Sequence, residues 1–208
     1  MEVTVAVATY GGDGWRHLAE ERALASAARL DLPTVAVHHP DGTIATARNE
    51  ALSRVTTPWV VHLDADDELE PAFGIYLARA ADPRPTVDVW VPEVRYMHPD
   101  GCPGLAHWPR VAGHTDHECS APCLPFGNWI VVGAAVRTEL ARRVGWLEWE
   151  RFEDWSMWLG CYYLGATFGR APGAVYRAHV RADSRNQRGT SGLEIHRAIA
   201  RHYGAPVP

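Results

Sequence analysis

The amino-acid sequence predicts an α/β fold: a single compact domain with a mostly parallel central sheet and helices on both faces. Short apolar strands alternate with segments of helical periodicity through the first half of the chain, the pattern of a parallel sheet covered by crossover helices. The segment 59–63 is apolar except for one histidine, as expected for a strand buried on both faces. The length of 208 residues and the hydrophobic content of 47% suit one domain with a substantial core.

The first half of the chain is expected to contain strands separated by helices. The turn-rich segment 11–14 closes the first strand, and Trp15, Leu18 and Ala19 then share one helical face. The same criteria predict strands over 3–8, 33–38 and 59–63 and at 87–91, with helices over 15–29, 45–55 and 71–81.

The second half begins with a segment that lacks periodicity. Residues 98–127 are rich in Pro, Gly, His and Cys, which predicts a long loop insertion, and such loops in compact domains are usually functional. After it we expect a strand over 129–136, a helix over 138–144 capped by Gly145, a helix from about Asp154 to before Gly165, a strand over 174–179 and a weak helix ending near Tyr203.

Composition excludes several classes of function. The net charge is −5, so nucleic acid is not expected as a direct non-specific partner. All 20 basic residues are arginines, which excludes mechanisms that need a catalytic or phosphate-binding lysine, such as P-loops and Schiff bases. No signal peptide is recognisable, and no apolar run approaches the ~20 residues that span a bilayer, so a cytoplasmic location without a transmembrane segment is expected.

An acidic segment follows the strand predicted at 59–63. Asp64, Asp66 and Asp67 stand at the carboxyl end of that strand, the edge at which open α/β sheets bind ligands. Three like charges there favour a bound cation, and carboxylate oxygens suit Mg²⁺ or Mn²⁺, which in turn hold phosphates. The alternative is a solvated acidic turn before a helix.

Two further sites are candidates for chemistry. Glu153 and Asp154 lie at a predicted helix start between bulky apolar residues, where a partly desolvated carboxylate can act as a general base. The alternative is helix capping by Asp154. His179 closes the last strand and is either a metal or diphosphate ligand or an ordinary structural histidine.

The insertion also contains potential zinc ligands. Cysteine and histidine in a loop without its own core suggest a structural Zn²⁺ site, although the spacing fits no standard zinc finger. The alternative is a loop with incidental reduced thiols. The residues concerned are Cys102, His107, His114, His117, Cys119 and Cys123.

Five segments, in this order, resemble motifs of the family 2 glycosyltransferases, which have the GT-A nucleotide-sugar-binding fold. They are the opening strand with its Thr-Tyr (4–10), a Gly-x-x-x-Ala-Arg-Asn helix (42–52), an Asp-x-Asp-Asp metal motif (63–69), a Glu-Asp motif on the acceptor side (144–155) and a Tyr-Arg-x-His motif (176–179). The resemblance implies a GT-A-like catalytic domain over 1–180, with 98–127 as a loop insertion, and a tail or helix over 181–208.

The resemblance also implies an activity: metal-dependent, inverting transfer of a sugar from a nucleoside-diphosphate donor to an acceptor hydroxyl. Mn²⁺ or Mg²⁺ is the implied cofactor. The implied roles are metal binding by Asp66 and His179, contact with the nucleotide by Asp64, lining of the nucleoside pocket by Thr9 and Tyr10, general base by Asp154 with Glu153 as second candidate, and a pyrophosphate contact or a bracing role for Arg48.

One departure from the family pattern concerns recognition of the nucleobase. The family usually has a second strand that ends in a paired aspartate motif, whereas here Asp41 is the only carboxylate near the end of that strand. A UDP-sugar is therefore the default donor, and the acceptor is unknown. The alternatives are a metal-dependent nucleotidyl- or phosphotransferase, or a non-catalytic nucleotide-sugar-binding protein of the same fold.

Overall fold

The computed structural model describes residues 1–82, 84, 86–109, 120–181 and 192–204. They form one α/β domain in which a curled seven-stranded sheet has the order β2-β1-β3-β6-β5-β7-β4. The strands are β1 (Val3–Tyr10), β2 (Thr34–His39), β3 (Trp59–Leu63), β4 (Glu68–Leu69), β5 (Val89–Met97), β6 (Ala135–Arg137) and β7 (Phe168–His179).

The helices are α1 (Asp13–Ala19), the π-helical η1 (Glu20–Leu24), α2 (Ala25–Ala28), α3 (Ile44–Arg54), α4 (Phe73–Ala81), the 3₁₀-helical η2 (Ala121–Phe126), α5 (Thr138–Val144), α6 (Glu153–Tyr163) and α7 (Gly192–His202). The first three run on without a break, so together they correspond to the single helix expected over 15–29. The predicted α/β class and GT-A-like fold are confirmed.

The direction of the strands follows from their pairing. β1 is parallel to both β2 and β3, β6 is antiparallel to β3 and β5, and β7 is parallel to β5. Five strands therefore run the same way, while β6 and the short β4, which pairs antiparallel with β7, run the opposite way. The sheet is mixed in its pairing but mostly parallel in direction.

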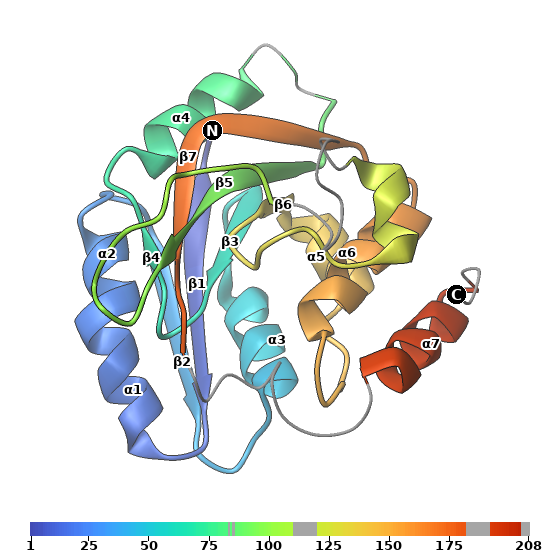
Figure 1. Cartoon of the computed structure of the whole chain (residues 1–208), viewed down its shortest axis with the longest axis horizontal. Coiled ribbons are helices and arrows are strands. Elements are labelled where there is room, and N and C mark those ends of the chain that lie inside the picture. The colour runs from blue at the N-terminus through green and yellow to red at the C-terminus, as the bar shows by residue number, and fades with distance from the viewer. Residues whose placement is uncertain (83, 85, 110–119, 182–191, 205–208) are drawn as a thin grey trace.

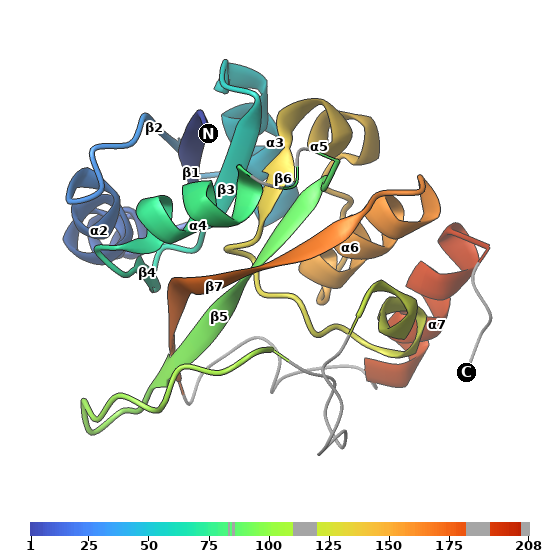
Figure 2. The same cartoon turned by 90° about the horizontal axis from the view of Figure 1, so that it is seen from above.

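Helices cover both faces of this sheet (Figures 1 and 2). Alternate residues of β1 face opposite cores: Val5 and Val7 pack in the same core as Phe73 of α4, whereas Ala6 and Ala8 pack in the core that contains Ala47 of α3. This alternation is the reason why the strand reads as a continuous apolar run in the sequence.

The expected strand over 129–136 is mostly wrong. Only β6 at Ala135–Arg137 is a strand, and a turn closed by a hydrogen bond from Ala134 N to Val131 O precedes it. Trp129 and Ile130 are buried without joining the sheet. An apolar run predicts burial, but it does not specify extended pairing, and here the run fills the core as irregular backbone.

Two other differences affect the acidic segment and the insertion. No pattern in the sequence predicted β4, which lies between the acidic segment and α4 and pairs with β7. Within the described part of 98–127, isolated bridges join Val94 to His107 and Met97 to Pro103, so the start of the insertion folds back along β5.

Candidate active site

One cleft collects nearly all of the candidate site residues at the carboxyl ends of β1 and β3. It has a volume of about 230 Å³. Its lining residues come from β1, α1, α3, the acidic segment, α6 and the end of β7, and they include Thr9, Tyr10, Trp15, Arg48, Asp64, Asp66, Glu153, Asp154, His179 and Arg181. Asp41 is not among them, since it lies in an exposed turn after β2.

Arg48 of α3 connects the two acidic motifs. Its guanidinium donates to Asp64 Oδ1 at 2.6 Å and to Glu153 Oε1 at 3.0 Å, and it stacks over the Trp146 ring at 4.3 Å. The side chain of Arg48 is buried, which opposes its charge, but Asp64 and Glu153 outweigh this effect and raise the Arg48 pKa above its ordinary value. The cation thus holds β3 and α6 at a fixed spacing across the cleft.

The Asn that follows Arg48 has a different task. Asn49 Nδ2 donates to Trp146 O at 2.8 Å, and Trp146 N donates to Asn49 Oδ1 at 2.9 Å. Trp146 Nε1 also donates to Nε2 of buried His62 at 3.2 Å. Burial and the charge of Arg48 lower the pKa of His62 to about 3, so this imidazole is a neutral acceptor. The Ala-Arg-Asn segment therefore braces the site, which was one of the two alternatives for Arg48, whereas the contacts of Asn49 were not predicted.

Asp64 and Asp66 both line the cleft. Burial, followed by the negative charge of Asp64, raises the pKa of Asp66 above its ordinary value. Arg22 donates to the backbone oxygen of Asp66 at 3.1 Å, and Arg181 Nε lies 4.0 Å from its Oδ2. Partly desolvated carboxylates with hard oxygen atoms fit Mg²⁺ or Mn²⁺, which proteins commonly bind through one or two carboxylates plus substrate phosphates.

The third carboxylate of the acidic segment faces the protein interior. Asp67 Oδ2 accepts from the Tyr176 hydroxyl at 2.6 Å, and its Oδ1 accepts from the backbone of His179 at 2.7 Å. Burial and the charges of Asp64 and Asp66 hold the pKa of Asp67 well above its usual range. Asp67 thus fixes the end of β7 against the cleft instead of facing a ligand.

His179 is held at the rim of the cleft by two contacts. Its backbone is bound by Asp67, and its Nε2 lies 3.0 Å from Glu68 Oε2. No group of three His, Cys, Asp or Glu side chains arranged for a metal ion occurs in the described parts of the chain. The protein therefore offers few ligands of its own, and Nδ1 is the His179 atom that the Glu68 contact leaves for a ligand.

Asp154 also lines the cleft, in the first turn of α6. Phe152, before it, has a left-handed backbone with φ of 62°. Asn128 Nδ2 donates to Asp154 Oδ2 at 2.7 Å, and Trp155 N donates to Asp154 Oδ1 at 2.8 Å. Burial and the adjacent charge of Glu153 raise the pKa of Asp154 to about 6. A carboxyl group of this kind is suited to proton transfer near neutral pH.

The end of β1 forms another part of the cleft lining. Thr9 is buried, and its hydroxyl lies 2.9 Å from His38 Nδ1 and 3.4 Å from Val37 O of β2. Tyr10 follows it at the rim. Asn128 and Arg22 were missed in the sequence because each contacts its partner across a long stretch of chain.

The structure describes only three of the six predicted zinc ligands. Cys102 is exposed, Cys123 is half-buried, and His107 Nδ1 contacts the Trp108 carbonyl at 2.9 Å. His114, His117 and Cys119 lie outside the described residues.

The model of the family described as "Glycosyl transferase family 2" matches residues 16–111, which include the Ala-Arg-Asn helix and the acidic segment. The match covers 96 of the 208 residues, slightly less than half of the chain, and it is a similarity to this family. A search of curated proteins found no match for this chain.

Solved structures of the S. aureus protein TarS share the fold. The crystal structure of TarS 1-349 in complex with UDP-GlcNAc matches with a TM-score of 0.67 and 16% identity over 98% of this chain and 65% of that one. The UDP complex matches with a TM-score of 0.64 and 18% identity over 96% of this chain and 64% of that one. The chain thus spans slightly less than two thirds of these two TarS chains. In its described residues, no helix is both long and apolar enough to cross a bilayer.

Proposed function

We propose that this protein is a metal-dependent, inverting glycosyltransferase that moves a sugar from a nucleoside-diphosphate donor to an acceptor hydroxyl. The observation that carries the proposal is the cleft lined by two carboxylate pairs, Asp64 with Asp66 and Glu153 with Asp154, which buried Arg48 links through Asp64 and Glu153. Two carboxylate sets around one cleft suit a displacement that needs charge stabilisation on one face of the sugar and a base on the other.

The base in this reaction is Asp154. Its carboxylate takes the proton of the acceptor hydroxyl as the acceptor oxygen bonds to the anomeric carbon and the diphosphate leaves from the opposite face, so the configuration inverts. The pKa of about 6 allows Asp154 to be ionised at neutral pH and still basic enough to accept a proton. Asn128 and the Trp155 amide orient its two oxygens.

The donor lies on the wall formed by β1 and the acidic segment. Asp66 would hold Mn²⁺ or Mg²⁺, with His179 as a further ligand, and the cation would neutralise charge on the departing diphosphate. Thr9 and Tyr10 line the nucleoside side, while Arg48 keeps Asp64 in place. UDP is the first nucleotide to test, because the related TarS structures contain UDP and UDP-GlcNAc.

The test is a calorimetric titration of nucleoside diphosphates and their sugars with and without Mn²⁺, followed by a transfer assay. We expect Mn²⁺-dependent binding of one nucleotide, its loss in Asp66→Ala, and normal binding without transfer in Asp154→Asn. Near-normal turnover by Asp154→Asn would contradict the assignment of the base. Absence of binding to every nucleotide would contradict the donor class.

A further inference from the structure

A second concave site lies away from the catalytic cleft, between α4 and the first half of β7. It has a volume of about 490 Å³ and is lined by Tyr76, Arg79, Ala80, Arg84, Trp108, Arg170 and Pro172. The volume falls within the range of ordinary ligand sites. α4 lies beside the amino-terminal end of β1 (Figures 1 and 2), whereas the catalytic cleft lies at the carboxyl end of that strand. The two sites are therefore at opposite ends of the sheet.

The charge of this site is opposite to that of the whole protein. Three of its seven lining residues are arginines and none is acidic, although the chain has a net charge of −5. Arg79 and Arg84 are exposed, and within the described residues neither has a carboxylate at salt-bridge distance. Arg79 and Arg84, with no described carboxylate at that distance, are placed to bind an anionic group through charge-assisted hydrogen bonds.

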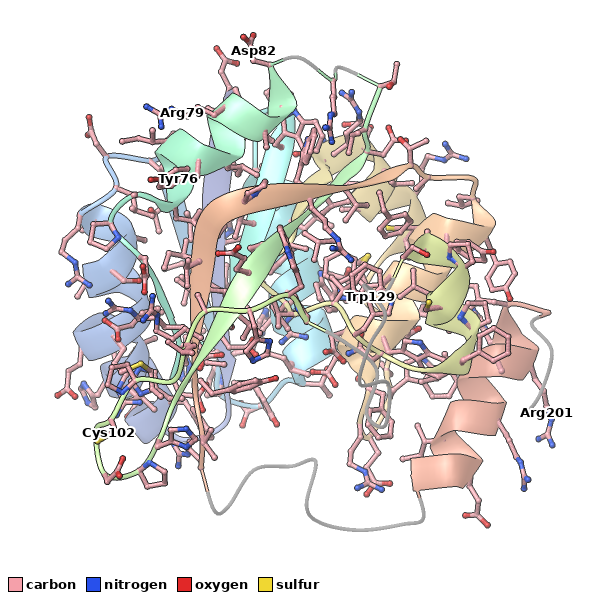
Figure 3. The ribbon with its side chains drawn as sticks, turned by 45° about the horizontal axis from the view of Figure 1, so that its top comes forward. Tyr76, Arg79, Asp82, Cys102, Trp129 and Arg201 are labelled. Atoms are coloured by element: carbon pink, nitrogen blue, oxygen red, sulfur yellow. The ribbon has the colours of Figure 1, made fainter. Side chains whose placement is uncertain are left out.

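Aromatic rings form the walls between these cations. Arg170 stacks over the Trp108 ring at 4.9 Å, and Arg79 stacks near the Tyr76 ring at 5.5 Å. Figure 3 shows Tyr76 and Arg79 projecting from α4. The Tyr76 ring approaches β7 at Gly173, where a Cβ would lie 2.7 Å from it and where φ is +81°. Gly173 is thus required both by the bend in β7 and by the close approach of the ring.

A smaller cavity shares Arg170 with this site. Arg170 also borders a space lined by Val91, Ser120, Phe168 and Trp129. Trp129 is 5% exposed, and its indole Nε1 finds no acceptor within the described part of the chain. A buried N–H without a partner is uncommon in folded proteins, and an oxygen of a bound molecule would satisfy it.

We propose that this site binds a sugar that carries a phosphate or carboxylate group, outside the catalytic cleft. The arginines account for the anionic group and the aromatic walls for a ring, since rings pack on aromatic faces. The choice of a sugar rests on the proposed transferase function, for which an anionic saccharide bound away from the catalytic cleft would be a regulator. A concave site with aromatic walls favours such a ring over a flat anionic membrane surface.

The experiment is calorimetric titration of the full chain with glucose 6-phosphate, with glucose and with phosphatidylglycerol vesicles. The test variant is Arg79→Gln/Arg84→Gln. The matched control is Arg143→Gln/Arg201→Gln, which removes two exposed arginines elsewhere; Arg201 is on α7 (Figure 3). We expect glucose 6-phosphate but not glucose to bind, with at least about a tenfold loss of affinity in the test variant and no change in the control. Saturating UDP with Mn²⁺ should leave this binding unchanged.

Four outcomes would overturn the proposal: no binding of glucose 6-phosphate, an equal loss in both double variants, displacement by UDP with Mn²⁺, or binding of vesicles alone. No binding of glucose 6-phosphate would exclude the proposed ligand class, and an equal loss of affinity in both double variants would indicate an effect of net charge alone. Displacement by UDP with Mn²⁺ would place the sugar phosphate in the catalytic cleft, and binding of vesicles alone would indicate a membrane-binding surface. Failure of the transferase proposal can be distinguished, because it would appear as absence of nucleotide binding. The affinities of the two double variants for glucose 6-phosphate could still be compared in that case.

Discussion

Removal of the Arg48 guanidinium should destabilise the protein strongly and in a pH-dependent way. Arg48 is 2% exposed and donates charged hydrogen bonds to Asp64 and Glu153. Leaving a buried charge without its partner costs about 3–5 kcal/mol. Because folded proteins are stable by only about 5–15 kcal/mol, Arg48→Ala should lose a large part of the free energy of unfolding at pH 7.5.

The loss should shrink as the pH falls, because carboxylates without their counter-charge can be neutralised by protonation. Urea unfolding at pH 7.5 and at pH 5 measures both effects. Arg54→Ala is the matched control, since Arg54 ends the same helix, is 55% exposed and pairs with Glu50 on the surface; it should cost less than about 1 kcal/mol. If Arg48→Ala does not fold, Arg48→Met/Glu153→Gln should recover part of the stability. A loss below about 1 kcal/mol, or one independent of pH, would refute the reasoning.

Four further predictions follow from the described contacts. Since burial and Glu153 raise the pKa of Asp154 to about 6, kcat/KM should increase with pH through about 6 and then level off; a flat profile from pH 5 to 8 would exclude Asp154 as the base. Between pH 4 and 6 the folded protein keeps the Asp154 proton, whereas the unfolded chain has lost it, so the free energy of unfolding of the wild type falls as the pH rises to about 6. Asp154→Asn lacks this titration, so between pH 4 and pH 7 its free energy of unfolding, measured with urea, should rise by up to about 3 kcal/mol relative to that of the wild type. Tyr176→Phe removes the hydrogen bond to buried Asp67 and should cost about 1–3 kcal/mol by the same measurement, an effect that a surface tyrosine would not produce. Burial raises the pKa of Cys161 to about 12, so mass spectrometry after brief alkylation should find exposed Cys102 modified and Cys161 intact; modification of both at equal rates would show that the core opens readily.

The sequence predicted best what depends on local pattern. The bounds of β3 were predicted at both ends, because a short apolar run between a turn and an acidic segment leaves little choice. Asp64 and Asp66 could be placed at a ligand-binding edge because the carboxyl ends of parallel strands meet there. The helix at 138–144 and its Gly145 cap were likewise local features, and Gly145 has a φ of 69°.

The parts that the sequence did not predict depend on contacts between distant segments. Asp67 belongs to the same acidic run as Asp66, yet its side chain binds Tyr176, 109 residues away, and no periodicity reports that choice. Asn128 reaches Asp154 from an irregular segment 26 residues earlier. The apolar run that begins at Trp129 was mistaken for a strand because the same residues fill a core in either conformation.

The carboxy-terminal helix has a consequence for any shortened version of this chain. Ile199 and Ala200 of α7 are fully buried, and the Tyr203 hydroxyl lies 3.3 Å from Ser156 on α6, the helix whose first turn carries Asp154. Cutting the chain after β7 would expose that apolar surface and remove a support of the helix that carries Asp154. The smallest unit that keeps the cleft supported therefore extends to at least Tyr203, although every residue of the cleft lies before residue 182.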